Sequence, residues 1–448
     1  MGTRSFPKDF LWGTATASYQ VEAAVTADGR LPGIWDTFSH TPGKTMHGQT
    51  GDTTVDQYNR YEEDVDLMRR MGAQSYRFSL AWPRIIPTGM GAVNQKGLDY
   101  YRRLADSLHS AGIQAAATLY HWDLPQVLQD AGGWPDRDTA LRFADYAEVC
   151  FRELKDSVDM WITLNEPWCS SYLGYGIGIH APGNTDMQEA YSAAHHLMVG
   201  HGLAVQRYRD AGLSAPIGIT LNMDSPRPAT LSPDDVAAAQ RANEFKTLAF
   251  LNPLLGRPRP AGLAERKPQY VFPDRAGDAE VIASPIDFLG LNFYHEPAIE
   301  DVPVSVSPDR FREAHVYHEK TEMGWPITPR GFYRHIKWVW EETGGRWPLY
   351  ITENGCAMPD ELDEAGTACH DPRRISYLRD HFTAALDAID EGVDLRGYFV
   401  WSLVDNFEWS WGISKRFGLI YIDYANNRRI PKDSYYYFRE VISGSEHF

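Results

Sequence analysis

Two glutamates, each placed where an apolar run stops, are the residues of this sequence best suited to chemistry. Glu353 follows the apolar, β-prone residues 349–352 and precedes an Asn-Gly pair, which is a strong turn signal. Glu166 follows the apolar run 160–165 and precedes Pro167, which biases Glu166 toward extended backbone. If both runs are strands of one sheet, the two carboxyls can cleave a sugar bond as acid/base and nucleophile. Taken alone, each glutamate is equally well explained as a solvated carboxylate at a strand end.

The elements around these glutamates repeat one arrangement: an amphipathic helical stretch, a glycine that can end it, and an apolar run. The arrangement occurs at residues 61–80, 98–120, 190–222 and 382–401. Such alternation of helices and apolar strands predicts a parallel sheet.

Apolar runs of this kind give eight candidate strands, at residues 10–13, 75–80, 115–120, 160–165, 217–222, 288–294, 349–352 and 395–401. Eight strands in one alternating chain predict an α/β fold, a single (β/α)₈ barrel over residues 1–448. Extended loops and the chemistry are then expected at the carboxyl ends of the strands. Residues 301–325, rich in proline and scattered charges, predict a long loop over one end of the barrel.

A doubly wound open sheet is the alternative fold. It would normally carry a glycine loop for phosphate, and the nearest stretch, residues 174–178, has the wrong spacing and opens no clear helix. We interpret residues 174–178 as a loop.

The composition narrows the classes of function. Acidic residues outnumber basic ones by 60 to 43, a net charge of −17, which argues against nucleic acid or an anionic membrane surface as a partner. Aromatic residues make up 13% of the chain, and stacking on sugars is one use for them beside a large aromatic core. The sequence shows no signal peptide, no membrane span and no paired cysteine spacing, so we expect a cytoplasmic protein with reduced thiols.

Polar and aromatic side chains stand at or just beyond the ends of the predicted strands, where a purely structural role would call for apolar ones. They are Gln20, Arg77, His121, Asn165, Asn292, Tyr294, Trp401, Glu408 and Trp409. Because the carboxyl ends of parallel barrel strands share one rim, we expect these groups to surround a common site.

Six motifs around these positions occur in a characteristic order. They are FLWGTA at 10–15 with Tyr19-Gln20, LYHWDLP at 119–125, TLNEP at 163–167, NFY at 292–294, ITENG at 351–355 and WSLVDNFEW at 401–409. On these motifs the sequence resembles the retaining β-glycosidases of glycoside hydrolase family one, over essentially the whole chain. One departure is the stretch QVEAA at 20–24, where the family usually has QIEGA, which predicts a shifted backbone behind Gln20.

The resemblance implies a role for each matching residue. Glu166 would be the general acid/base and Glu353 the nucleophile, with Arg77, Asn292 and Tyr294 holding and tuning Glu353. The hydroxyls of the first sugar would be bound by Gln20, His121, Asn165, Glu408 and Trp409, over a stacking floor formed by Trp401. The leaving group would face Trp168, Cys169, Trp325 and Phe417.

The chemistry of a retaining hydrolase explains the two central roles. The mechanism needs carboxyls about 5 to 5.5 Å apart, one charged to attack and one protonated to release the leaving oxygen. Arg77 would keep Glu353 ionised, and the nearby anion would raise the pKa of Glu166 toward about 6.

The expected function is therefore hydrolysis of terminal β-D-glycosyl residues through a covalent glycosyl-enzyme intermediate. Glucosides, and also galactosides and fucosides, are the expected substrates, as oligosaccharides or as aryl and alkyl glycosides, with a role in cellulose degradation. The preferred sugar, the preferred leaving group and assembly into a homo-oligomer stay open.

Two other functions are compatible with the same scaffold. A non-catalytic sugar-binding protein would not need both Glu166 and Glu353. A phospho-β-glycosidase should carry a serine, lysine and tyrosine cluster after the last strand, where Glu408 and Trp409 stand.

No cofactor or metal is expected. His195, His196 and His201 lie on one predicted helix, but their spacing does not match a helical metal site. Cys356, Cys369 and His370 also lack the spacing of metal ligands.

Overall fold

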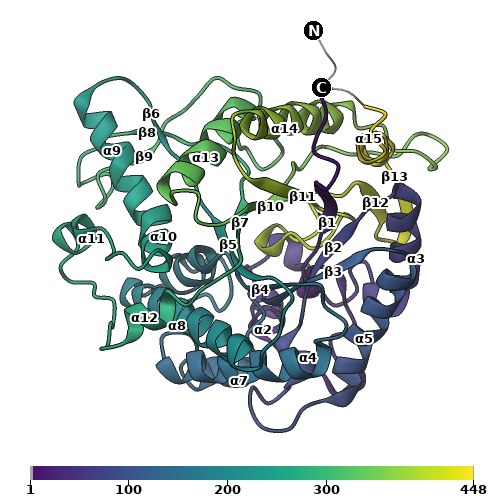
Figure 1. Cartoon of the computed structure of the whole chain (residues 1–448), viewed down its shortest axis with the longest axis horizontal. Helices are drawn as coiled ribbons and strands as arrows, with labels where there is room; N and C mark the ends of the chain where they lie inside the picture. Colours follow the sequence, from purple (N-terminus) through teal and green to yellow (C-terminus); the bar gives the residue numbers. More distant parts are fainter. Residues whose placement is uncertain (1–3, 447) are drawn as a thin grey trace.

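The computed structural model describes residues 4–446 and 448, and its centre is a closed barrel of eight parallel strands (Figure 1). The strands are β1 (Leu11–Ala15), β2 (Ser75–Ser79), β3 (Gln114–Tyr120), β4 (Met160–Asn165), β5 (Ile217–Asn222), β7 (Phe288–Asn292), β10 (Leu349–Asn354) and β11 (Leu395–Trp401). Each predicted strand is present, with ends that differ by up to two residues. The prediction of a (β/α)₈ barrel is confirmed, and the open-sheet alternative is excluded because β1 pairs with both β2 and β11.

The strands form because they are apolar runs that the fold buries on both sides. All residues of β2 and β4 are buried, as parallel strands covered by helices require. The strand register then fixes which ends meet. Glu353 stands opposite Asn292 on the neighbouring strand, and Ala15 stands opposite both Arg77 and Trp401.

An outer layer of helices surrounds the barrel (Figure 1). Helices of this layer include α3 (Gln57–Met71), α5 (Gln95–Ser110), α7 (Arg137–Leu154), α8 (Met187–Asp210), α13 (Pro329–Glu342), α14 (Pro372–Asp390) and α15 (Asp433–Ile442). In α5 the predicted apolar face, Leu98, Tyr101, Leu104 and Leu108, is buried. Gly72 ends α3 in the left-handed conformation, with φ of 83°, as the glycine stop signal predicts.

Shorter elements build the connections. The short helices are α1 (Ser18–Val21), α2 (Ile34–His40), α4 (Trp82–Ile85), α6 (Gln126–Asp130), α9 (Pro233–Asn243), α10 (Ala249–Leu254), α11 (Ala261–Arg266) and α12 (Asp278–Ile282). Short 3₁₀ turns cover Ala27–Gly29, Met46–Gly48 and Trp409–Trp411, and two π-helical turns are η3 (Cys169–Ile177) and η4 (Glu244–Leu248). A hairpin joins β12 (Ile420–Asp423) and β13 (Arg428–Pro431), and a small sheet joins β6 (Arg227–Pro228), β8 (Ala298–Glu300) and β9 (Arg312–Glu313).

Two loop predictions have different outcomes. Residues 301–325 are mostly irregular, as predicted, with the two-residue strand β9 and scattered turns. The interpretation of residues 174–178 as a loop is wrong for most of its length, because residues up to Ile177 belong to the π-helical turn η3. This turn is anchored by Tyr172 and Tyr175, each 1% exposed, which glycine spacing alone does not reveal.

All four cysteines lie in the described part of the chain, where they are free and buried. No helix there combines the length and the apolar character that crossing a membrane needs.

Candidate active site

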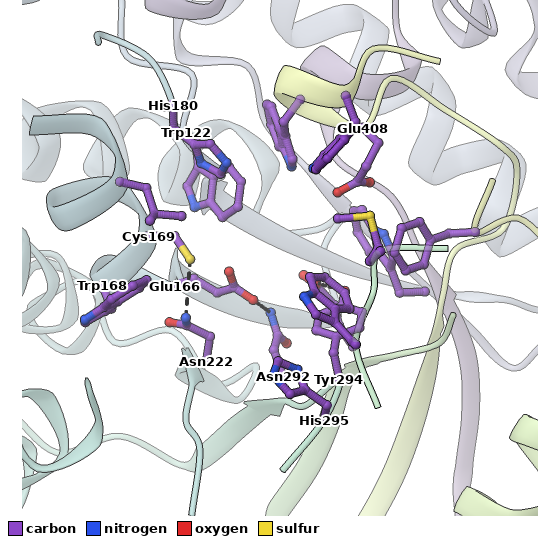
Figure 2. Close-up of a pocket in the computed structure, with 18 of the residues that line it drawn as sticks. Trp122, Glu166, Trp168, Cys169, His180, Asn222, Asn292, Tyr294, His295 and Glu408 are labelled. Atoms are coloured by element: carbon purple, nitrogen blue, oxygen red, sulfur yellow. Dashed lines mark hydrogen bonds between the residues drawn. The ribbon is translucent and has the colours of Figure 1, made fainter. Parts of the chain in front are cut away.

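A cavity of about 330 Å³ opens at the carboxyl ends of the barrel strands, and both Glu166 and Glu353 line it (Figure 2). The two side chains come from the ends of β4 and β10. Both residues are nearly inaccessible to solvent, with exposed fractions of 5% and 3%. The barrel therefore brings together two carboxyls that lie far apart in the sequence.

Glu353 is held by two donors, one on each carboxylate oxygen. Arg77 Nη1 donates to Oε1 over 2.6 Å, and the Tyr294 hydroxyl donates to Oε2 over 2.7 Å. Arg77 is itself fixed, because its other nitrogens donate to Thr118 and Asn165. Such charge-assisted bonds orient a carboxylate and compensate its charge.

Asn292 departs from the expectation that it holds Glu353. Its amide donates to Glu166 Oε1 over 2.6 Å and to Asn165 Oδ1 over 3.1 Å. The amide oxygen accepts from the Thr352 hydroxyl over 2.8 Å. Because Thr352 fixes the oxygen, the nitrogen is turned toward Glu166, and the predicted partner was wrong.

The backbone of Glu166 is left-handed, with φ of 50°, so the expectation of extended backbone is also wrong. The chain has to pass from strand β4 into a helical turn at this one residue. Its N–H donates to the carbonyl of Thr220 on β5, and its carbonyl accepts from Ser170 in the following turn. Trp122 and Trp409 at the same cavity also have positive φ, of 75° and 52°. Such backbone outliers tend to cluster at functional sites.

The surroundings of Glu166 favour its protonated form. Burial, and then the charge of Glu353, raise the pKa of Glu166 to about 7, against the opposing hydrogen bonds from Asn292 and Cys169. The direction matches the sequence-based expectation. At neutral pH a substantial fraction of Glu166 therefore carries a proton beside Glu353.

The cavity is lined by His121, Trp401, Glu408 and Trp409. The resemblance implies that these residues bind the first sugar, and we call this part of the wall the sugar-binding end. The His121 ring lies nearly parallel to the rings of Trp401 and Trp409, at centroid distances of 5.8 and 6.0 Å. Burial, and then the charge of Arg77, lower the pKa of His121 well below its usual range, so the ring is neutral.

Glu408 is a buried acid at this end. Burial, and then the charges of Glu353 and Glu166, raise the pKa of Glu408 to about 8. Glu408 is therefore mainly protonated at neutral pH. One of its oxygens, Oε2, is buried and has no hydrogen-bond partner among the described residues.

Two residues expected to contact sugar do not line the cavity. Gln20 donates to the carbonyl of Phe407 over 2.8 Å and to Asn406 over 3.0 Å, and it is fully buried. Asn165 accepts from Arg77 over 2.6 Å and contacts His121 over 3.1 Å. Asn165 thus contacts the lining residue His121, and Gln20 contacts the backbone next to the lining residue Glu408.

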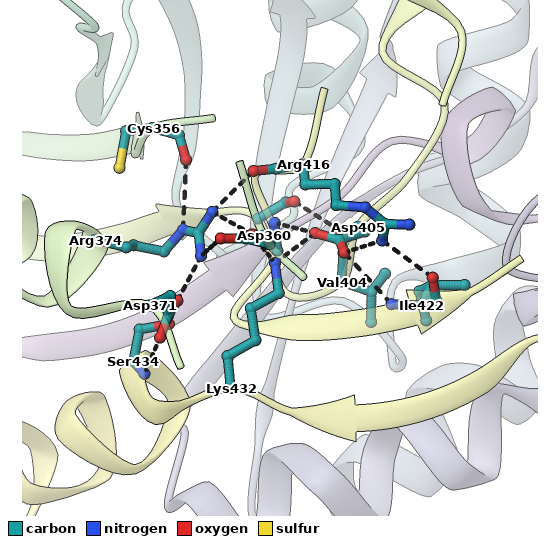
Figure 3. A network of polar contacts seen from close by, with 12 residues as sticks. Cys356, Asp360, Asp371, Arg374, Val404, Asp405, Arg416, Ile422, Lys432 and Ser434 are labelled. Atoms are coloured by element: carbon teal, nitrogen blue, oxygen red, sulfur yellow. Dashed lines mark hydrogen bonds and ion pairs between the residues drawn. The ribbon is translucent and has the colours of Figure 1, made fainter. Parts of the chain in front are cut away.

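A buried ion network supports the loop that carries Glu408 (Figure 3). It balances three acids against three bases: Asp360, Asp371, Asp405, Arg374, Arg416 and Lys432. Lys432 is fully buried and its Nζ lies 2.7 Å from Asp405 and 2.5 Å from Asp360. Asp405 also accepts from the backbone of Gly418 over 2.9 Å. The network thus ties the segments after β10 and β11 to the β12–β13 hairpin and α15.

The cavity is also lined by Trp168, Cys169, Trp325 and Phe417. The resemblance implies that these residues face the leaving group, and we call this part of the wall the leaving-group end. Trp325 packs on Tyr294 at a centroid distance of 5.2 Å and on Phe417 at 6.3 Å. Asn222 donates to the Cys169 sulfur over 3.3 Å. Figure 2 shows Trp168, Cys169 and Asn222 on the same side of the cavity as Glu166.

Sequence reasoning missed several residues of the cavity wall. They are Leu173, Ile179, His180, Asn222, Asp224, Lys246, His295, Met323 and Trp411. Asn222 could have been found, because it ends a predicted strand as Asn165 and Asn292 do. Lys246 gave no signal, since a lysine in a polar helical stretch is normally a solvated residue.

The histidines of α8 have structural partners. His195 contacts Asp278 over 2.7 Å, His196 contacts the carbonyl of Trp134, and His201 contacts the Thr163 hydroxyl over 2.7 Å. Within the described residues, no three histidine, cysteine or acidic side chains are grouped so as to hold a metal ion.

A (β/α)₈ barrel with two carboxyls at strand ends, one bonded to arginine and tyrosine and one with a raised pKa, defines a glycoside hydrolase site. The model of the family described as glycosyl hydrolase family 1 matches residues 2–447, and the chain belongs to that family.

Curated relatives and solved structures agree with this assignment. The chain is 45% identical to beta-glucosidase A of Thermotoga maritima, covering 99% of each chain. It is 43% identical to a bifunctional beta-D-glucosidase/beta-D-fucosidase of Bifidobacterium breve, covering 98% of this chain and 99% of that protein. The structure of the family 1 β-glucosidase from Thermotoga maritima superposes with a TM-score of 0.96 at 44% identity, covering 100% of both chains.

Proposed function

We propose that this chain, a glycoside hydrolase of the β-glucosidase type, releases terminal β-D-glucosyl residues by double displacement. Glu353 is the proposed nucleophile and Glu166 the proposed general acid/base. The observation that carries the assignment is the contrast between the two carboxyls. Glu353 is bonded on both oxygens by Arg77 and Tyr294, whereas the pKa of Glu166 is raised to about 7.

In the first step, a carboxylate oxygen of Glu353 attacks the anomeric carbon while the glycosidic bond breaks. Glu166 transfers its proton to the departing oxygen, so the leaving group departs as a neutral alcohol. The products of this step are the glycosyl ester of Glu353 and the ionised Glu166.

In the second step, Glu166 removes a proton from water, which attacks the same carbon and restores the Glu353 carboxylate. Ester formation makes this step possible, because it removes the negative charge of Glu353 that raises the pKa of Glu166. The same residue therefore donates a proton before ester formation and accepts one after it.

The sugar-binding end supports a role in holding the glucose. Its stacked aromatic rings, neutral His121 and buried Glu408 offer an apolar floor with a few convergent polar groups. We propose that Glu408 contacts the O4 and O6 hydroxyls, and that galactosides and fucosides are also cleaved. The Bifidobacterium breve relative is named a beta-D-glucosidase/beta-D-fucosidase, which supports cleavage of fucosides.

We also propose a cytoplasmic location, which the four free cysteines of the described chain support.

The stereochemistry of the first product tests the mechanism. Double displacement predicts retention, so proton NMR during early hydrolysis of an aryl β-glucoside should show β-glucose before mutarotation produces the α anomer. Initial α-glucose would contradict the nucleophile assignment.

A further inference from the structure

A lysine on a π-helical turn reaches the leaving-group end of the cavity. Lys246 belongs to η4, which lies between helices α9 and α10, and its side chain lines the cavity wall. Single π-helical turns inside longer helices occur frequently at functional sites. Asp224, two residues beyond β5, holds this turn in place, because its carboxylate pairs with Lys246 and its carbonyl accepts from Thr247 over 2.8 Å.

Lys246 is the only lysine or arginine among the described residues that line the cavity. Its Nζ lies 5.2 Å from the centroid of the Trp168 ring. Burial lowers the pKa of Lys246, but the charge of Asp224, the hydrogen bond to it and the nearby Cys169 and Glu166 together outweigh burial and raise the pKa, so the ammonium group stays charged. Because Asp224 neutralises it, the pair gives no net attraction for an anionic leaving group.

The pair keeps hydrogen-bonding capacity for a ligand. The side chains of Lys246 and Asp224 are 27% and 14% exposed, so neither is closed off by protein. An ammonium group has three N–H donors, and the described contacts of Lys246 use one of them, toward Asp224. Lys246 therefore offers donors and Asp224 an acceptor, side by side at the cavity wall.

The chemistry of the wall distinguishes between types of leaving group. A sugar has neighbouring hydroxyls that can accept from Lys246 and donate to Asp224, and an apolar ring face that can stack on Trp168 or Trp325. An alkyl or unsubstituted aryl group would cover the ion pair and form no hydrogen bond with it. Covering a polar group without a new partner is unfavourable.

We propose that the Lys246–Asp224 ion pair recognises the hydroxyls of a sugar leaving group, which raises the specificity of this enzyme for disaccharides and short oligosaccharides. This inference rests on the proposed β-glucosidase function and names the substrate class for the same site. The pair determines specificity and takes no part in bond breaking.

The test compares kcat/KM for cellobiose and phenyl β-glucoside in the wild type and in Lys246→Met. Both substrates form the same glucosyl-enzyme, so a defect at the sugar-binding end or at Glu353 changes both values equally. The ratio of cellobiose to phenyl glucoside isolates the leaving-group end. We expect this ratio to fall about tenfold or more in Lys246→Met, as loss of one charged hydrogen bond predicts.

A matched control is Lys337→Met. Lys337 pairs with Glu391 over 3.1 Å, is 24% exposed, and lies on α13 away from the cavity. The ratio should stay at the wild-type value in this variant. Assays at about pH 5.5 keep Glu166 protonated, so that loss of the Lys246 charge does not act through that residue.

Asp224→Asn provides a second variant, and activity of each variant on phenyl glucoside shows that it is folded. A wild-type ratio in both Lys246→Met and Asp224→Asn would overturn the inference and leave the proposed function intact. A wild type that cleaves phenyl glucoside but not cellobiose would also overturn it. A wild type that cleaves neither substrate would overturn the proposed function, and the inference with it.

Discussion

The sugar-binding end of the cavity rests on barrel strands and a buried ion network, whereas the leaving-group end rests on loops and two π-helical turns. At the first end, Trp401 is the last residue of strand β11, and the ion pair between Lys432 and Asp405 holds the loop that follows this strand. At the second end, Cys169 and Lys246 stand on η3 and η4, and Trp168 and Trp325 are only half-buried. Groups on rigid elements can hold one sugar in a single orientation, while exposed apolar groups accept varied partners.

Because the two ends are built differently, the dependence of the rate on the sugar and its dependence on the leaving group should respond to different substitutions. A change at the sugar-binding end should alter the response to the sugar, and a change at the other end should alter the response to the leaving group. Glu353 and Glu166 lie between the two ends, and the comparison predicts a different behaviour for each.

The largest effect is expected for Glu353→Gly. Loss of the proposed nucleophile should lower hydrolysis about 10⁴-fold or more, whatever the leaving group, because no glycosyl ester can form. Added azide should occupy the vacated space and give the α-glucosyl azide, identified by NMR. A folded variant that hydrolyses any β-glucoside at a near-normal rate, or forms no azide adduct from an activated glucoside, would contradict the assignment.

Glu166→Ala should show an effect that depends on the leaving group. Cellobiose needs protonation of its leaving oxygen, so its kcat/KM should fall about 10²- to 10⁴-fold. Dinitrophenyl glucoside needs no proton, so formation of its intermediate should be affected far less, as measured by the burst of dinitrophenol. An equal loss of rate for both substrates would contradict the assignment of Glu166 as the acid/base residue.

The pH dependence of the wild type provides the second part of this prediction. Glu166 must be protonated to donate, and its pKa is raised to about 7, so kcat/KM should be highest below that pH and fall as pH rises above it. In Glu166→Ala this basic limb should be absent with dinitrophenyl glucoside. A limb that persists would mean that another group donates the proton.

Lys432→Met tests the rigidity of the sugar-binding end. The substitution leaves Asp360 and Asp405 buried without their shared cation, and breaking a buried ion network in this way costs about 3–5 kcal/mol of unfolding free energy. Denaturant titration measures the loss. Lys337→Met should lose far less unfolding free energy, because the ion pair of Lys337 with Glu391 is partly exposed. Similar losses in the two variants would contradict a special role for the network.

The smallest effect is expected for Glu408→Ser, which tests recognition of the sugar. Loss of the hydrogen bond between protonated Glu408 and O6 should cost about 0.5–1.5 kcal/mol in kcat/KM for glucosides. Fucosides lack the O6 hydroxyl and should be slowed much less, and the comparison uses nitrophenyl glycosides of both sugars. Equal slowing of glucosides and fucosides would show that Glu408 does not recognise the O6 hydroxyl.

The residues at strand ends were the part of the site that the sequence predicted best. Glu166, Glu353 and His121 each follow an apolar run, and in a parallel barrel all such ends meet at one rim. Residues on loops and irregular turns carry no such periodic signal, which is why Lys246 and Asp224 were missed although the neighbouring Trp168 was found.

The sequence by itself determined the eight strands, the barrel and the two carboxyls at one cavity, because the alternation of helices with apolar strands and the position at a strand end are local patterns. Only the tertiary structure decided the partners of each group. It turned Asn292 toward Glu166, turned the Gln20 amide toward the carbonyl of Phe407, and raised the pKa of Glu408 to about 8. These properties depend on burial and on charges from distant segments, and no local pattern contains either.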